Sequence, residues 1–189
     1  MNKYNEVEYK FRTPLKKITD LVDGLSRLGT ITGLKNSDGT DYYYIISSLP
    51  KSFIRHRISQ DQNELTVKKF LQAKDTVNRL EVDLKLNQAS VEDINTFLSI
   101  LQAQFIFLLT KHVLVVFLKE YPDVIFSIAQ INEEDLFVEI EMKKDEPSTI
   151  KARLQKLDQC AQSLLSLNLI TAPREERSFF EIYCPFPLL

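Results

Sequence analysis

The chain has 189 residues, of which 44% are hydrophobic and 26% are charged, as in an ordinary globular domain. Its net charge of −2, from 24 basic and 26 acidic residues, gives no reason to expect a nucleic-acid or membrane surface. Two cysteines are too few for a disulfide framework, and the polar beginning "MNKYNEVEYKFR" does not have the pattern of a secretory leader. We therefore expect one domain over residues 1–189, located in the cytoplasm, with reduced thiols.

The first predicted strand is "NEVEYKFR" (residues 5–12), in which charged and hydrophobic side chains alternate. Because successive side chains of a strand point to opposite faces, two acids and two bases share one face there. After this strand, Thr13-Pro14 predicts the start of a helix that ends before Gly29. The charged residues of the strand are Glu6, Glu8, Lys10 and Arg12.

The rest of the chain combines strands with two further helical patterns, which begin at Ser90 and near Ser148. The run "FIFLLTKHVLVVFL" (105–118) is too short to span a membrane and contains Lys111 and His112, so we expect a buried strand. The other strands are expected at "DYYYII" (41–46), "SFIRHRIS" (52–59), "ELTVKKF" (64–70), "NRLEVDLKL" (78–86), "VIFSIAQI" (124–131) and "LFVEIEMKK" (136–144). About eight strands with few crossover connections indicate an α+β fold.

Four or five of these strands repeat the pattern of one hydrophobic face and one face of mixed charge. For each strand alone, a solvated face with opposite charges paired across strands is a sufficient explanation. The helices, however, supply enough hydrophobic surface to cover a sheet from outside, so the sheet could close into a barrel with its charges inside. Such charges have to pair with one another, or bind a metal or a charged ligand. Several bases together with several carboxylates suit a polyphosphate with Mg²⁺ or Mn²⁺.

These motifs resemble a known family. "EVEYK" matches the ExExK signature of the CYTH superfamily, the triphosphate tunnel metalloenzymes, which includes class IV adenylate cyclases, thiamine triphosphatases and inorganic triphosphatases. The resemblance covers nearly the whole chain, because further motifs follow in the order of that family. They are Asp41-x-Tyr43, Arg55-x-Arg57, Thr66-x-Lys68, Arg79-x-Glu81-x-Asp83 and Glu139-x-Glu141.

The resemblance implies an eight-stranded antiparallel β-barrel, a triphosphate tunnel, with helices packed outside. Acidic residues would hold Mg²⁺ or Mn²⁺ there, and basic residues would hold the triphosphate. The implied metal ligands are Glu6, Glu8, Glu81, Glu139 and Glu141. The implied phosphate-binding residues are Lys10, Arg12, Arg55, Arg57, Lys68, Arg79 and Lys111. Catalysis would depend on Glu6, Glu8, Lys10, Glu139 and Glu141.

The sequence departs from the family pattern in two strands. In the family, the sixth strand carries a lysine followed two residues later by an arginine, whereas here Lys111 is followed by Val113. The seventh strand normally offers an aspartate, and here Ala129 or Gln130 stands at that place, depending on the alignment. The acids Glu133, Glu134 and Asp135 are expected in the turn that follows.

Three functions remain open at this stage. The first is metal-dependent hydrolysis of a triphosphate such as tripolyphosphate, thiamine triphosphate or a nucleoside triphosphate, with catalysis by positioning and electrostatics. The second is a class IV adenylate cyclase, which converts ATP to cyclic AMP and pyrophosphate. The third is a catalytically weakened module that binds polyphosphate or nucleotide, which the two departures favour. In each case we expect a triphosphate-containing small molecule as partner, no nucleic acid, no membrane, and a monomer or homodimer.

Overall fold

The computed structural model describes residues 8–60, 62–70, 79–86, 89–143 and 149–186, without the side chains of residues 70 and 79–81. The described chain forms two compact units, each assembled from separate segments. Unit 1 contains residues 39–110 and 177–186, and unit 2 contains residues 8–38 and 111–176. The strand order is β1-β9-β8-β7-β3-β4-β5-β6, with β2 also pairing with β7, and the strand pairs within each unit are antiparallel.

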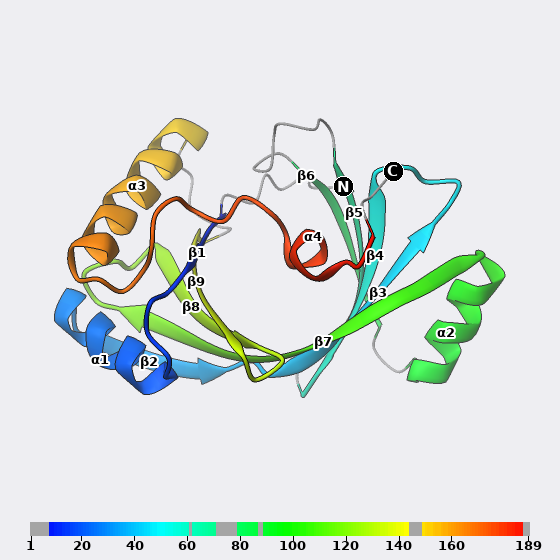
Figure 1. Ribbon diagram of the computed structural model, residues 1–189, viewed down its shortest axis with the longest axis horizontal. Coiled ribbons are helices and arrows are strands. Elements are labelled where there is room, and N and C mark those ends of the chain that lie inside the picture. The colour runs from blue at the N-terminus through cyan, green and yellow to red at the C-terminus, as the bar shows by residue number, and fades with distance from the viewer. Residues whose placement is uncertain (1–7, 61, 71–78, 87–88, 144–148, 187–189) are drawn as a thin grey trace. The chain divides into compact units, whose positions relative to one another are not determined.

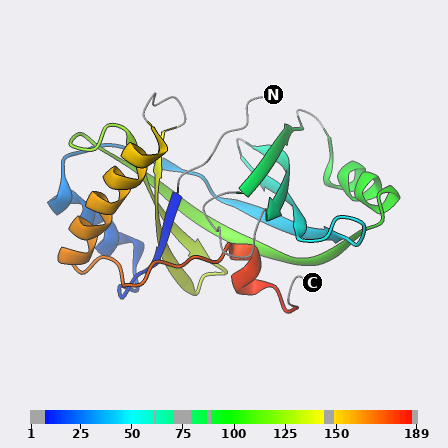
Figure 2. The ribbon, with the colours of Figure 1, turned by 90° about the horizontal axis from the view of Figure 1, so that it is seen from above.

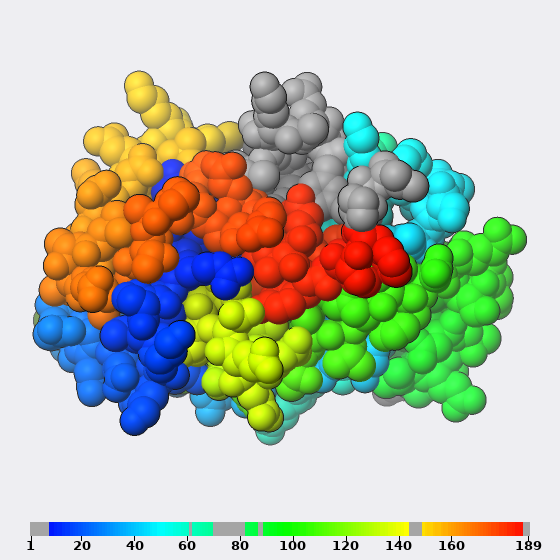
Figure 3. All heavy atoms as spheres, viewed as in Figure 1, coloured from blue at the N-terminus to red at the C-terminus, as the bar shows by residue number. Residues whose placement is uncertain are grey.

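Unit 2 is a sheet with two helices on one face (Figure 1, Figure 2). Its strands are β1 (Glu8–Arg12), β2 (Ile31–Asn36), β8 (Val124–Ile131), β9 (Asp135–Met142) and the second half of β7 (Ala103–Leu118). Its helices are α1 (Ile18–Leu28) and α3 (Ile150–Ser166). Figure 3 shows the atoms of the segment that contains α3 (orange) adjoining those of the segment that contains α1 (blue).

The core of unit 2 explains why these segments form strands and helices. Alternate residues of β8 and β9, including Phe126 and Ile140, are fully buried against Leu21 of α1 and Leu157 of α3. This burial is the main stabilising contribution, because apolar surface is removed from water. The opposite face of the sheet, called here the polar face of unit 2, carries the charged members of the alternating pattern.

Unit 1 contains the remaining strands of the same sheet, with one helix on each face. Its strands are β3 (Gly39–Ile46), β4 (Ser52–Ser59), β5 (Asn63–Phe70), β6 (Arg79–Lys85) and the first half of β7. Helix α2 (Val91–Ile100) begins at Ser90, whose hydroxyl and backbone complete a capping box with Asp93. It packs through Ile94 and Leu98 on the face that carries Tyr44 and Ile54. The opposite face is called here the polar face of unit 1.

Helix α4 (Phe179–Tyr183) packs on the polar face of unit 1. The ring of Phe180 is fully buried and stacks on Phe53 with a centroid separation of 4.5 Å and an interplanar angle of 6°. The same ring lies 5.6 Å from Tyr43 and 5.5 Å from Phe107. These four aromatic residues form what is called below the aromatic cluster.

Most other predicted elements are confirmed, including the α+β class, the antiparallel sheet and the helix starts at Ser90 and near residue 149. Helix α1 starts at Ile18 instead of Thr13-Pro14, because the Thr13 hydroxyl accepts the Leu15 N–H and closes a local turn. Strand β2 was not predicted. Among the described residues no helix is long and apolar enough to cross a membrane.

Candidate functional site: two polar sheet faces

On the polar face of unit 2, β1 and β9 bring their charged residues together. The strand register pairs Glu8 with Glu141 and Lys10 with Glu139. The Lys10 ammonium lies 3.6 Å from a Glu139 carboxylate oxygen, and the two side chains are 8% and 19% exposed. Such burial strengthens the interactions between these charges relative to water.

The carboxyl group of Glu139 is in electrostatic conflict with that of Glu8. Burial, the nearby charge of Glu8 and a hydrogen bond to Glu8 raise the pKa of Glu139 to about 7, although Lys10 and Lys111 act in the opposite direction. The carboxyl pair therefore holds a proton below about pH 7, and a bound cation would compete with that proton. This donor set fits a hard divalent cation such as Mg²⁺ or Mn²⁺, which prefers carboxylate oxygen ligands.

Lys111 is also buried, with 5% of its surface exposed, and lies on the same face at the beginning of the unit 2 part of β7. The next residue on that face, Val113, lies opposite Ala129 of β8. Because Ser127 lies opposite Glu139, Ala129 shares the polar face and Gln130 does not. Val113 and Ala129, the two positions at which the sequence departs from the family pattern, therefore lie side by side. Together they form an uncharged patch close to charged residues.

Arg12 is held by two carboxylates that the sequence analysis did not assign to it. Its guanidinium lies 3.6 Å from Asp135 and 3.6 Å from Glu175, and 4.9 Å above the ring of Phe137. The backbone of Glu175 hydrogen-bonds to Lys10 of β1, which brings this distant acid to the strand. Asp135, expected in a turn, is the first residue of β9. Arg12 remains 44% exposed, so a phosphate group can approach it.

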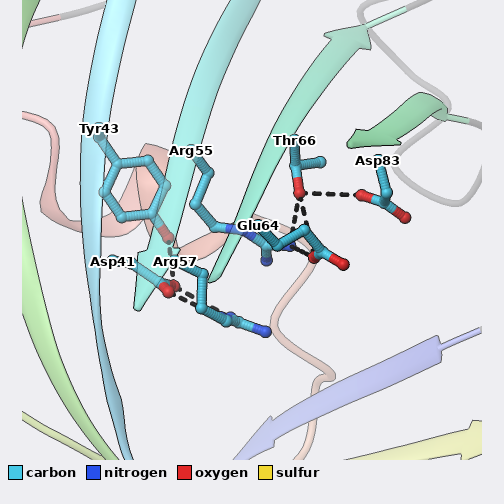
Figure 4. Close-up of polar contacts among 7 residues, drawn as sticks. All are labelled: Asp41, Tyr43, Arg55, Arg57, Glu64, Thr66 and Asp83. Carbon is cyan, nitrogen blue, oxygen red and sulfur yellow. Dashed lines mark hydrogen bonds and ion pairs between the residues drawn. The ribbon is translucent and has the colours of Figure 1, made fainter. Parts of the chain in front are cut away.

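On the polar face of unit 1, acidic and basic residues alternate across the strands. The register places Asp41 opposite Arg57, and Arg57 opposite Glu64. Arg57 donates from Nε and Nη2 to the two oxygens of Asp41 at 2.7 and 3.0 Å (Figure 4). Asp41 is fully buried. A buried carboxylate with a bidentate guanidinium partner is a strong, directional ion pair.

A second row on this face connects Arg55, Thr66 and Asp83. Arg55 donates to the Thr66 hydroxyl at 3.0 Å, and that hydroxyl donates to Asp83 at 2.8 Å (Figure 4). Arg55 also lies 3.6 Å from Glu64. Arg55 and Arg57, two of the arginines predicted to bind phosphate, are therefore brought together, each with an acidic neighbour.

The remaining predicted site residues are described only in part. Lys68 is half-buried and lies opposite Phe53 and Glu81. The backbones of Arg79 and Glu81 belong to β6, but their side chains lie outside the described part of the chain, and Glu6 lies entirely outside it. Among the described residues, no group of three His, Cys, Asp or Glu side chains is arranged to hold a metal. Among the described residues, the Glu8–Glu139 pair is therefore the candidate metal site.

No protein-family model matches the chain, and no curated protein matches its sequence. Solved structures do match. A candidate adenylate cyclase from Vibrio parahaemolyticus has a TM-score of 0.70 and 17% identity, over 96% of this chain and 98% of that one. A candidate adenylyl cyclase from Hippeastrum with a dominant triphosphatase activity has a TM-score of 0.56 and 13% identity, over 97% and 98%.

A chain in the structure of the Schizosaccharomyces pombe Mediator head module also matches, with a TM-score of 0.63 and 15% identity, over 90% of this chain and 99% of that one. At these identities the likeness concerns the fold. The antiparallel α+β fold that the strand motifs indicated is the fold of these solved structures. The likeness to the Mediator chain means that this fold alone does not define an activity.

Proposed function

We propose that this protein is a divalent-metal-dependent phosphohydrolase that acts on a triphosphate. The observation that carries the proposal is the half-buried Glu8–Glu139 carboxyl pair, with Lys10 and Lys111 beside it. A metal–polyphosphate complex requires carboxylates that bind the metal and basic side chains close by that bind the phosphate groups. The fold shared with a Hippeastrum protein of dominant triphosphatase activity supports the same conclusion.

In this proposal Glu8 and Glu139 hold Mg²⁺ or Mn²⁺, with Glu6 and Glu141 as further ligands. When bound, the metal supplies positive charge that offsets the charge of the phosphate oxygens. Each polar face has its own proposed phosphate-binding residues, which are Lys10 and Lys111 in unit 2 and Arg55, Arg57 and Lys68 in unit 1. Water attacks the terminal phosphorus, the bond to the bridging oxygen breaks, and orthophosphate leaves with a diphosphate product.

Phosphorus NMR tests this directly. The purified protein is incubated with tripolyphosphate or ATP, with Mg²⁺ or Mn²⁺ and in chelator. We expect orthophosphate with pyrophosphate or ADP, and only when metal is present. Cyclic AMP with pyrophosphate would instead identify an adenylate cyclase, the activity for which the Vibrio protein is a candidate. Product formation at the same rate in chelator would contradict metal dependence.

A second candidate is a triphosphate-binding module without turnover, and the Val113–Ala129 pair favours it. The family that the strand motifs resemble has an arginine and an aspartate at these two positions. Their replacement by valine and alanine removes one phosphate-binding group and one carboxylate. The Mediator chain that shares the fold is a further reason to keep this candidate. Resonances that shift or broaden on addition of protein, with both substrates intact, would identify it.

A further inference from the structure

The polar face of unit 1 contains a carboxylate that the phosphate-binding scheme does not use. Asp41 is fully buried, and both of its oxygens accept hydrogen bonds from Arg57. This side-on pairing fixes the plane of the guanidinium. It engages Nε and Nη2 of Arg57. Arg57 itself is 28% exposed, so its guanidinium is accessible from the polar face.

Asp41 is in turn fixed by Tyr43. The Tyr43 hydroxyl donates to Asp41 at 3.2 Å, and the two side chains project from β3 on the same face (Figure 4). Burial, together with the charge of Asp41, raises the pKa of Tyr43 well above its usual value, so the hydroxyl stays protonated as a donor. The arrangement is a relay of three side chains, from tyrosine to aspartate to arginine.

The relay ends in the aromatic cluster, which immobilises Tyr43. Its ring stacks on Phe107 at 4.8 Å with an interplanar angle of 22°, and contacts the Phe180 ring of α4 at 5.6 Å. A ring enclosed in this way loses its rotamer freedom when the protein folds and not when a ligand binds. The hydroxyl is therefore aimed at Asp41 before any ligand is present.

We propose that Asp41 is a positioning residue that holds the Arg57 guanidinium in the orientation that receives phosphate, and that Tyr43 holds Asp41 for this task. The inference rests on the proposed function, because it requires Arg57 to bind the triphosphate. It assigns to Asp41 no contact with metal or substrate. Preorganised charged donors bind an anion more tightly than mobile ones, because ordering them costs nothing on binding.

The first test uses single substitutions and calorimetric titration with Mg²⁺-tripolyphosphate. Asp41→Asn removes the charge and one acceptor at constant size, and we expect Kd to rise about tenfold to a hundredfold. Tyr43→Phe removes only the hydroxyl, and we expect a rise of about twofold to fivefold. Tyr44→Phe is the matched control, because the neighbouring hydroxyl donates to Asn95 at 2.7 Å on the α2 side. It should leave Kd unchanged.

The second test separates positioning from a direct or merely structural role. If Asp41 acts through Arg57, the loss caused by Asp41→Asn disappears once Arg57 is already alanine. We therefore expect the double variant and Arg57→Ala to have Kd values within about twofold of each other. Each variant is titrated at a temperature at which circular dichroism shows it to be folded, and Tyr43→Phe decides the matter if Asp41→Asn does not fold.

Three results would overturn the inference while leaving the proposed function intact. They are wild-type affinity in both Asp41→Asn and Tyr43→Phe, an equal loss in Tyr44→Phe, and losses that add in the double variant. If the wild-type protein neither binds nor hydrolyses any triphosphate, the proposed function is wrong and this inference is wrong with it.

Discussion

The polar faces of the two units are built from the same residue types and differ in how their charges are satisfied. In unit 1 acids and bases alternate, so that Asp41 meets Arg57 and Glu64 meets Arg55. In unit 2 the half-buried acid Glu139 has a second acid, Glu8, as its neighbour, and loss of hydration together with the charge of Glu8 raises its pKa to about 7. In the described part of the first face each arginine has an acidic partner, whereas on the second face two carboxyl groups lie together in spite of the nearby lysines.

This difference suggests that the two faces have different functions. A complementary network holds its guanidinium groups in place before a ligand arrives, which suits the recognition of phosphate. A carboxyl pair that shares a proton exchanges that proton for a cation, which suits metal binding. The comparison therefore predicts that the same chemical substitution has different consequences on the two faces.

The largest expected difference concerns turnover. Glu139→Gln removes a proposed metal ligand and should lower metal-dependent hydrolysis of tripolyphosphate about a hundredfold or more. Glu64→Gln makes the same change on the polar face of unit 1, beside Arg55, and should cost less than about tenfold. Rates are measured by release of orthophosphate. Equal losses in both variants would remove the distinction between the two faces.

The second prediction concerns the packing that supports the unit 1 network. Phe180→Ala empties the centre of the aromatic cluster and should lower the free energy of unfolding by about 3–5 kcal/mol. Phe186 belongs to the same C-terminal segment but is 64% exposed, and its replacement by alanine should cost under about 0.5 kcal/mol. Urea unfolding measures both. Equal, small effects would show that α4 does not stabilise this face.

The pH dependence of stability should follow the Glu8–Glu139 pair when metal is removed. Because the pKa of Glu139 is about 7 in the folded protein against an ordinary 4.5, the folded state binds more protons in this interval. Its contribution, roughly 3 kcal/mol, is complete below pH about 4.5 and is lost as pH rises through about 7. Unfolding in chelator at pH 5 and pH 8 should show this loss in the wild type and not in Glu139→Gln. A stability that rises over this interval in the wild type alone would contradict the prediction.

The smallest effect is expected from restoring a charge in the uncharged patch. Val113 is half-buried on the polar face, opposite Ala129. Val113→Arg should tighten tripolyphosphate binding about tenfold, because a charge-assisted hydrogen bond is added. Val113→Met adds length without charge and should not change Kd. Binding by Val113→Arg no tighter than by the wild type would show that the patch lies away from the phosphate.

Alternation along the chain was sufficient to predict the strands that carry Glu8, Lys10, Arg55 and Glu139, because each buries one face. The alternation did not predict which charged side chains form ion pairs across neighbouring strands. The pairing of Asp41 with Arg57 depends on the register between β3 and β4, and a shift of one residue would reverse every face.

The contacts of the C-terminal segment were also beyond sequence reasoning. Glu175 reaches Arg12, and Phe180 enters the aromatic cluster, through packing between segments far apart in the chain. A helix of five residues gives no periodic pattern to detect. The one local signal was the capping box of Ser178 and Glu181, which marks where α4 begins.

The proposed metal site can be tested by calorimetric titration of Mn²⁺ into the wild type, Glu139→Gln and Glu64→Gln at pH 6 and pH 8. We expect one site in the wild type, bound about tenfold more weakly at pH 6 because a proton competes for the carboxyl pair. We expect Glu139→Gln to lose this site and Glu64→Gln to keep it. Wild-type binding by Glu139→Gln, or loss of binding in Glu64→Gln, would show that the carboxyl pair of unit 2 is not the metal site.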